Sequence, residues 1–260
     1  TFIRVREIHF FEAHTAHIDE DDATRQINED LEIVENLMNE LNFPVIITKR
    51  PVWDTFPGAW YTIAIDVIMP DGRTLQVASV HHYRDQWAKA FDVKYENESG
   101  EQKYVHQTTY GMSERLLGAT VATHGDDKGL RLPPKIAPVQ IVIVPISKND
   151  EDKNAIKLFL NSIINSLNTV GVRIHVDWTN NTPGYKFNEW EMKGVPLRME
   201  VGPRDIKNDK VVLVRRDLGE KLFILKQDIL STVPQLLEKI QNNLFTQAKK
   251  FRDVNTHSVS

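Results

Sequence analysis

The order of hydrophobic and polar positions in the first half of the chain predicts an antiparallel sheet packed with helices. Segments rich in β-branched and aromatic residues are separated by turn residues, such as Pro70 and Gly72 on either side of Asp71, which favours hairpins. Between them, apolar residues recur at three- and four-residue steps, which is typical of helices with one buried face. The predicted elements are strands at residues 1–12, 45–48, 61–69, 74–80 and 105–110, and helices at residues 22–42, 85–91 and 111–123.

The second half has a different pattern. Pro133, Pro134 and Pro138 mark the expected domain boundary, because proline interrupts both helix and sheet. Residues 140–144 then form an almost unbroken apolar run, typical of a strand buried on both faces. Strands are predicted at residues 140–144, 172–176, 197–201 and 211–215, and helices at residues 153–168, 184–193 and 228–250. This alternation predicts an α/β domain with a mixed sheet.

Composition narrows the possible chemistry. The 260 residues include no cysteine, which excludes thiolate catalysis, cysteine zinc sites and disulfides. The formal net charge is −4, so any binding to nucleic acid has to use a local basic patch. No apolar run approaches the roughly 20 residues of a membrane span, and we expect no membrane association. The sequence starts at Thr1 inside a predicted strand and ends soon after a long helix, so we expect a fragment of a longer protein.

The first predicted strand carries a candidate ligand-binding face. Alternate residues of a strand share one face, which would align Arg4, Arg6, Phe10, Glu12 and His14 if no bulge intervenes. Arginine can hold phosphate, a carboxylate can hold an ammonium group, and an aromatic ring can cover an apolar ring. An exposed sheet edge would account for the same residues.

The returning strand of the predicted hairpin carries a second candidate group. Regular alternation places Gln76, Ala78 and Val80 on one face and Ser79 and His81 on the other. Small residues beside a histidine leave room for a ligand, although a lone histidine is more often structural.

The third candidate lies where a predicted strand passes into a helix. Ser113 and Glu114 suit a helix N-terminus as cap and dipole partner. Arg115 does not suit a helix N-terminus, because a cation in the first turn opposes the helix dipole. An anionic ligand at that end of the helix would explain it.

The fourth candidate is residues 186–205, which mix aromatic, acidic and basic side chains. Carboxylates can accept hydrogen bonds from guanine, and arginine or lysine can donate to its O6 or N7 atom. A salt-bridged loop is the alternative. The chain has no P-loop, no dinucleotide-binding glycine motif and no HExxH zinc motif.

In this order the four segments resemble prolyl-tRNA synthetase of the archaeal and eukaryotic type, a class II aminoacyl-tRNA synthetase. Residues 1–17 resemble the second strand of motif 2, and residues 111–134 resemble motif 3. Residues 56–61 and 71–81 resemble the substrate-pocket hairpin, and residues 190–205 resemble the anticodon-binding signature. The sequence departs from the family at Phe10, Ser79 and the pair Val77-Ala78, where tryptophan, threonine and two glycines are common.

The resemblance implies roles for individual residues. The residues implied to bind ATP are Arg4, Gln76, Ser79, Ser113 and Arg115. Of these, Arg4 and Arg115 are implied to be catalytic, and Gln76 is the candidate Mg²⁺ contact. Proline binding falls to Phe10, Glu12 and His81. Recognition of the anticodon guanines falls to Glu191, Arg198, Arg204 and Asp205.

The implied architecture is a partial α+β antiparallel catalytic sheet followed by an α/β anticodon-binding domain with a mixed five-stranded sheet. We expect the catalytic part at residues 1–133, the anticodon-binding domain at 134–250 and the start of a further domain at 251–260. The parent enzyme is expected to be a cytoplasmic homodimer that uses ATP, Mg²⁺, L-proline and tRNA(Pro).

Two alternatives remain at this stage. One is a non-catalytic relative that binds tRNA, against which the presence of Arg115 argues. The other is a class II synthetase for threonine or glycine, and the threonine enzyme uses a zinc ligand of a kind that this cysteine-free chain lacks. The first strand of motif 2 and all of motif 1 are absent, so we expect the 260 residues alone to be inactive in proline activation.

Overall fold

The computed structural model describes residues 3–257. It contains two compact units. The first unit includes the described residues up to Thr123 and those from Lys249 onward, and the second comprises His124–Ala248. None of the described helices is long and apolar enough to cross a membrane.

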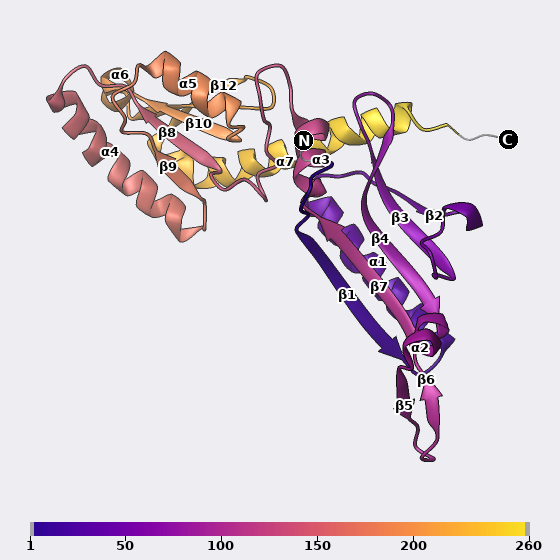
Figure 1. The fold of residues 1–260 in the computed structure, drawn as a ribbon. Coiled ribbons are helices and arrows are strands. Elements are labelled where there is room, and N and C mark those ends of the chain that lie inside the picture. The colour runs from indigo at the N-terminus through magenta and orange to yellow at the C-terminus, as the bar shows by residue number, and fades with distance from the viewer. Residues whose placement is uncertain (1–2, 258–260) are drawn as a thin grey trace. The chain divides into compact units, whose positions relative to one another are not determined.

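The first unit is built on an antiparallel five-stranded sheet with the order β1-β7-β4-β3-β2 (Figure 1). Its strands are β1 (Phe10–His17), β2 (Ile46–Lys49), β3 (Tyr61–Ile68), β4 (Thr74–Arg84) and β7 (His106–Ser113). The helices are α1 (Glu20–Glu40), α2 (Gln86–Phe91) and α3 (Arg115–His124), and a single 3₁₀ turn, η1, spans Val52–Asp54. The predicted antiparallel arrangement is therefore confirmed.

Helix α1 covers one face of this sheet (Figure 1). It begins after Asp19, whose side chain accepts a hydrogen bond from the Asp22 amide at 2.8 Å and caps the helix. Its apolar stripe, which includes Ile27 and Val34, packs against Val80 and other sheet residues. Burial of each such side chain contributes about 1.5–3 kcal/mol, which holds the helix on the sheet.

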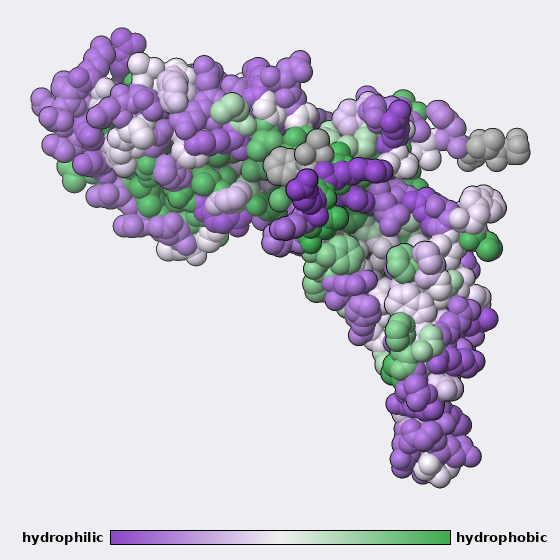
Figure 2. Space-filling model, in the orientation of Figure 1, coloured by the Kyte–Doolittle hydropathy of each residue, from purple (hydrophilic) through white to green (hydrophobic). Residues whose placement is uncertain are grey.

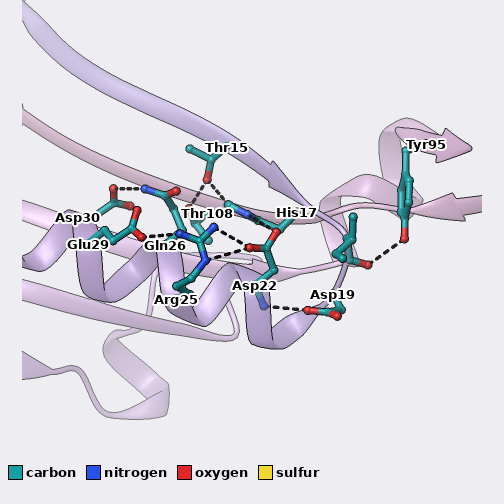
Figure 3. Close-up of polar contacts among 11 residues, drawn as sticks. Thr15, His17, Asp19, Asp22, Arg25, Gln26, Glu29, Asp30, Tyr95 and Thr108 are labelled. Carbon is teal, nitrogen blue, oxygen red and sulfur yellow. Dashed lines mark hydrogen bonds and ion pairs between the residues drawn. The ribbon is translucent and has the colours of Figure 1, made fainter. Parts of the chain in front are cut away.

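Polar contacts fasten the end of β1 to α1 on this same face (Figure 3). His17 donates from Nδ1 to the Asp22 carboxylate at 3.0 Å. Thr15 on β1 and Thr108 on β7 are joined through their hydroxyl groups. These contacts leave the opposite face of the sheet available for other functions.

A small hairpin of β5 (Lys94–Glu96) and β6 (Gln102–Tyr104) was not predicted from the sequence. Its strands have only three residues each and few apolar positions, so the hydrophobic pattern is weak. Its surface is largely hydrophilic in Figure 2, in keeping with the exposure of Lys94, Glu96, Gln102 and Lys103.

The predicted strand at residues 1–12 is wrong in its boundaries. The strand starts at Phe10 and continues to His17, and residues 1–2 lie outside the described part of the chain. Pairing with β7 begins at Phe10 opposite Ser113, after which β7 gives way to the start of α3. Because β7 ends there, residues 3–9 run beyond the ladder that would hold them in a strand.

The second unit contains a mixed five-stranded sheet with the order β12-β11-β10-β8-β9. Strands β8 and β9 both run parallel to their neighbours, whereas β11 is antiparallel to β10 and β12. Its strands are β8 (Ile141–Pro145), β9 (Ile174–Val176), β10 (Leu197–Val201), β11 (Lys210–Arg215) and β12 (Lys221–Leu225). The mixed five-stranded sheet is confirmed, and the pattern analysis had missed β12.

Helices cover both faces of the second sheet. They are α4 (Asp150–Thr169), α5 (Pro183–Met192), α6 (Pro203–Lys207) and α7 (Ile229–Val254), with a 3₁₀ turn, η2, at Lys226–Asp228. Ile141 and Ile143 of β8 belong to the core formed with α4 and α7, whereas Val142 and Val144 pack towards α5. Burial on both faces explains the unbroken apolar run of this strand.

Candidate functional site

The sheet face opposite α1 brings together polar residues from three strands. Glu12 on β1 lies directly opposite Gly111 on β7, which in turn lies opposite Ser79 on β4. Directly paired residues of antiparallel strands project to the same face. In the next row, Thr109 pairs with His81. Glu12, Ser79 and His81 therefore share this face, and the predicted grouping of Ser79 with His81 is confirmed.

A β-bulge adds Gln76 to the same group. Ile65 pairs with Ala78, but the next residue, Asp66, pairs with Gln76, so Val77 is an extra residue on β4. The predicted grouping of Gln76 with Ala78 on the opposite face is thus wrong. Its cause is the bulge, which reverses the alternation at Val77 and places Gln76 on the side of Asp66.

An arginine links Gln76 to a buried carboxylate. Arg50 donates to both carboxylate oxygens of Asp66, at 3.0 and 2.8 Å, and lies 3.4 Å from the Gln76 side-chain oxygen. Burial raises the pKa of Asp66, and the positive charge of Arg50 opposes that rise. This pair fixes the Gln76 end of the site, and the sequence analysis had singled out neither Arg50 nor Asp66.

His81 is held through both of its ring nitrogens. Its Nδ1 is hydrogen-bonded to Thr62 at 2.9 Å and its Nε2 to Ser79 at 3.0 Å. The Phe56 ring lies 4.9 Å away between centroids. Burial lowers the pKa of His81, while the nearby Glu12 carboxylate acts in the opposite direction. A neutral, oriented imidazole beside an acid and an aromatic ring can bind a small polar ligand.

Phe10 forms an exposed apolar cover next to this row. A side chain at Gly111 would put its Cβ 2.7 Å from the Phe10 ring and 3.0 Å from the Phe11 carbonyl oxygen, so the close approach requires glycine. The Phe10 side chain is 54% exposed. A flat ligand can therefore reach its ring.

Arg115 connects the start of α3 to the bulge. Its Nη1 donates to the Gln76 carbonyl oxygen at 3.1 Å, and its Nε donates to that of Ile3 at 3.3 Å. Its backbone amide donates to the Ser113 hydroxyl at 3.3 Å. The predicted helix start at Gly111 is wrong, because β7 continues to Ser113 and α3 begins at Arg115. The carbonyl oxygens of Gln76 and Ile3 offset the unfavourable position of this cation at a helix N-terminus.

Arg4 and Arg6 do not share the strand face of Glu12. Both are exposed and precede β1, so the prediction that alternation aligns them with Phe10 and His14 is wrong. His14 does lie next to Glu12, with Nε2 3.0 Å from the carboxylate.

The second unit contains a cavity of about 190 Å³ between α5 and strands β8, β10 and β11. Glu191 and Arg198 both line it, and Val142 and Val195 form part of its apolar wall. Arg198 donates to Glu200 at 2.8 Å and packs over the Phe187 ring at 4.2 Å.

The other two predicted RNA contacts lie elsewhere in the second unit. Arg204 and Asp205 are in the short helix α6, which follows β10, and they are not among the residues that line this cavity. The Asp205 carboxylate accepts a hydrogen bond from the Gly202 amide at 2.8 Å, and Arg204 is exposed. The sequence segment therefore supplies two separate groups of residues.

Comparisons with known proteins match both units. The family model described as "tRNA synthetase class II core domain (G, H, P, S and T)" matches residues 1–124, and that described as "Anticodon binding domain" matches residues 140–242. A proline–tRNA ligase of Thermococcus kodakarensis is 54% identical over 250 residues, covering 96% of this chain and 52% of the relative. The chain belongs to the prolyl-tRNA synthetase family.

Two further members of this family also match the chain over almost its whole length. A proline–tRNA ligase of Pyrococcus abyssi is 52% identical over 256 residues, covering 98% of this chain and 53% of the relative. The crystal structure of prolyl-tRNA synthetase from Cryptosporidium parvum complexed with L-proline and AMP matches with a TM-score of 0.92 and 40% identity, covering 97% of this chain and 55% of that one. The chain thus spans about half the length of the curated relatives it matches.

Sequence reasoning missed four charged residues that line the second-unit cavity, Lys128, Arg215, Arg216 and Lys221. Lys128 lines it and forms an ion pair with Glu191 at 3.1 Å. Lys128 also lies between the two stretches that the family models match. The only signal in the sequence was its place in a short charged turn before Gly129, which by itself indicates no ligand.

Proposed function

We propose that this chain is part of an ATP-dependent proline–tRNA ligase, which forms prolyl-adenylate and transfers the prolyl group to tRNA(Pro). The observation that carries the proposal is the sheet face shared by Glu12, His81 and Gln76, next to which Arg115 donates to the Gln76 carbonyl oxygen. Together these residues offer an acid, an imidazole and a cation. The names of the curated relatives, and the proline and AMP of the Cryptosporidium complex, support the same reaction.

Proline would bind at the end of this face occupied by Glu12 and His81. The Glu12 carboxylate can accept hydrogen bonds from the positively charged secondary amine, and an ion pair of this kind orients the ligand. Phe56 and His81 offer ring surfaces to the apolar pyrrolidine. Phe10, next to Glu12 on the same face, would close the site from the side of β1.

ATP would bind towards the bulge and the start of α3. Arg115 and Arg4 would offset charge on the phosphates, and Ser113, Ser79 and Gln76 would supply hydrogen bonds. With the reactants held in line, the proline carboxylate attacks the α-phosphorus and pyrophosphate leaves. A terminal hydroxyl of the tRNA then attacks the prolyl carbonyl carbon and AMP leaves, so no covalent enzyme intermediate is required.

Mg²⁺ fits this site as an ion carried largely by the nucleotide. It prefers oxygen ligands and commonly keeps several waters and substrate phosphates. The described residues contain no cluster of three or more acidic, histidine or cysteine side chains that could hold a metal. Gln76 would therefore supply a single amide oxygen, and the bound ion would neutralise phosphate charge.

Recognition of tRNA would fall to the second unit. Glu191 and Arg198 would bind one guanine of the proline anticodon in the cavity beside α5, because acid and base together match a guanine edge. Arg204 and Asp205 would bind the other guanine near α6. The domain limits that we propose are residues 1–133 for the catalytic part and 134–250 for the anticodon-binding part, with residues 251–260 beginning a further domain.

The proposal includes a homodimer that works in the cytoplasm, where ATP and tRNA are available together. Sedimentation of a chain as long as the curated relatives tests the dimer. A monomer that remains fully active would contradict this part of the proposal.

The reaction is tested by changing Arg115 in a chain extended to the length of the relatives. We expect Arg115→Ala to lower proline-dependent ATP–pyrophosphate exchange by about 100- to 1,000-fold, because one lost charge contact in a transition state costs about 2.7–4 kcal/mol. Arg25→Ala is the matched control, since Arg25 lies on α1 and is 57% exposed. Exchange at the unaltered level in Arg115→Ala would refute the assignment, as would activation of threonine or glycine in place of proline.

A further inference from the structure

Several lysine and arginine side chains line the cavity beside α5, and most of them are held by ion pairs with buried or partly buried carboxylates. Arg198 pairs with Glu200, and Arg215 pairs with Asp217 at 2.7 Å. The side chains of these two arginines are only 16% and 9% exposed. Such buried, paired guanidinium groups keep fixed positions, because turning away would leave their carboxylate partners buried without a counter-charge. Arg198 can therefore contact a guanine only from the place beside Glu200 where it is held.

Lys128 differs from these arginines. Its side chain is 69% exposed and its ammonium group lies 3.1 Å from the Glu191 carboxylate, which is 27% exposed. A lysine on a flexible stem can adjust its three donors at little cost. Lys128 is therefore a cavity cation that can rotate to meet a ligand while staying beside Glu191.

The backbone around Lys128 is nevertheless well fixed. Gly129 has a φ of +124°, and a Cβ there would collide with the Met192 backbone at 2.6 Å, so the turn packs tightly on the end of α5. Arg216 adds a clamp, because it donates to both Asp126 carboxylate oxygens and to the Glu191 carbonyl oxygen at 2.9 Å. A rigid turn therefore holds the backbone of Lys128 next to Glu191.

We propose that Lys128 is a specificity-determining residue that reads guanine together with Glu191. The Glu191 carboxylate accepts from guanine N1–H and its amino group, and the Lys128 ammonium donates to O6. The spacing supports this, since an acceptor and a donor 3.1 Å apart resemble the separation of neighbouring groups on a base edge. Adenine presents an acceptor at N1 and a donor at its 6-amino group. The acceptor would face the Glu191 carboxylate and the donor would face the Lys128 ammonium, so neither could form a hydrogen bond.

This inference rests on the proposed tRNA-binding function and deepens it. Lys128 comes from the segment that follows α3 and lies outside the stretch matched by the anticodon-binding family model, residues 140–242. A protein trimmed to that stretch would keep Glu191 and Arg198 but lose the O6 donor.

The test measures binding of the 260-residue chain to anticodon stem-loops of tRNA(Pro) by fluorescence anisotropy at one fixed salt concentration. In one loop series each anticodon guanine is replaced in turn by 6-thioguanine, which keeps N1–H and the amino group but weakens the acceptor at position 6. We expect the unaltered chain to bind the guanine loop about tenfold more tightly than one of the two substituted loops, the range of a good base contact.

Lys128→Met is expected to bind both loops equally, and Lys128→Arg to restore the preference. Lys193→Met is the matched control, because Lys193 directly follows α5, pairs with Glu189 and does not line the cavity. This control should keep the tenfold preference. A Lys128→Met chain that still prefers guanine tenfold would overturn the proposal, as would an unaltered chain without any preference for O6 over sulfur.

If the proposed anticodon recognition itself is wrong, the experiment gives a different result from the one that would overturn the role of Lys128. If the unaltered chain binds the proline anticodon loop no better than a loop with those guanines changed to adenine, the proposed anticodon recognition itself is wrong. Thermal melting of each variant shows whether the fold is retained, and an exposed lysine is expected to have little effect on it.

Discussion

At the scale of single residues, Asp177 shows how tertiary contacts decide the properties of a charged group. Its side chain is buried, which alone would raise its pKa, but hydrogen bonds from Thr179 and Trp190 outweigh that effect. The pKa of Asp177 is therefore lowered to about 2. The buried Lys186 ammonium also donates to the Asp177 carbonyl oxygen at 2.9 Å. The sequence did not show the contacts with Lys186 and Trp190, because both residues lie on α5, several positions further along the chain.

A carboxyl group with a lowered pKa in the folded state stabilises the fold above its unfolded pKa, near 3.8, and loses this contribution as the pH falls through about 2. We expect Asp177 to contribute about 2 kcal/mol at pH 7. The measurement is urea unfolding between pH 7 and pH 2. Asp177→Asn should flatten the acid part of this profile, and a profile identical to that of the unaltered chain would contradict the account.

At the scale of elements, α1 was predicted as a helix with one apolar face, and its buried stripe confirms this. The stripe also includes Asp30, which is 1% exposed. One of its carboxylate oxygens accepts from Gln26 at 2.9 Å (Figure 3), and the other has no partner among the described residues. Burial raises the pKa of Asp30. Helical spacing identifies this position as buried, but only packing shows that the carboxyl group is incompletely bonded.

A raised pKa in the folded state means that the contribution of Asp30 to the stability of the first unit is fully present below its unfolded pKa and is lost as the pH rises through the folded value. We expect Asp30→Asn to raise the free energy of unfolding at pH 7 by about 1 kcal/mol or more, because it removes a poorly solvated charge and keeps the Gln26 acceptor. Chemical denaturation measures this change. Asp21→Asn, at an exposed position of the first turn, should not stabilise, and a destabilised Asp30→Asn chain would refute the interpretation.

The bulge in β4 is the clearest limit of pattern reasoning at this scale. A strict two-residue period assigns Gln76 to the core face, yet Val77 and Ala78 are both buried and the alternation reverses there. A bulge depends on how two strands pair, and pairing partners are distant in sequence. The face of Ser79 and His81 was predictable because no irregularity separates those two residues.

At the scale of the whole molecule, net charge bears on the proposed binding of RNA. The net charge of −4 provides no long-range attraction, so binding has to depend on local cations such as Lys128 and Lys221. Lys221 is 55% exposed at the cavity and lies 3.7 Å from Glu200. In the proposed complex with RNA, its exposed ammonium group would meet a phosphate.

We expect Lys221→Met to weaken binding of every anticodon loop by a similar factor. The slope of log affinity against log salt should also fall by about 0.7, the contribution of one phosphate contact with single-stranded RNA. Anisotropy titrations over a range of salt concentrations measure both effects. Lys103→Met in the β5–β6 hairpin is the control. An unchanged slope, or a loss confined to one base, would assign Lys221 a different role.

The sequence by itself determined the two architectures and the family, because hydrophobic periodicity and turn residues are local properties and the motif segments are contiguous. It also identified Glu12, His81, Arg115, Glu191 and Arg198 as candidates. Tertiary structure decided which of these candidates meet: the bulge turned Gln76 to the face of Ser79, and the end of β7 left Arg4 outside the strand. It also brought together Lys128 and Glu191, which are 63 residues apart in the sequence, in an ion pair. Such contacts depend on how distant segments pack, and no local pattern encodes them.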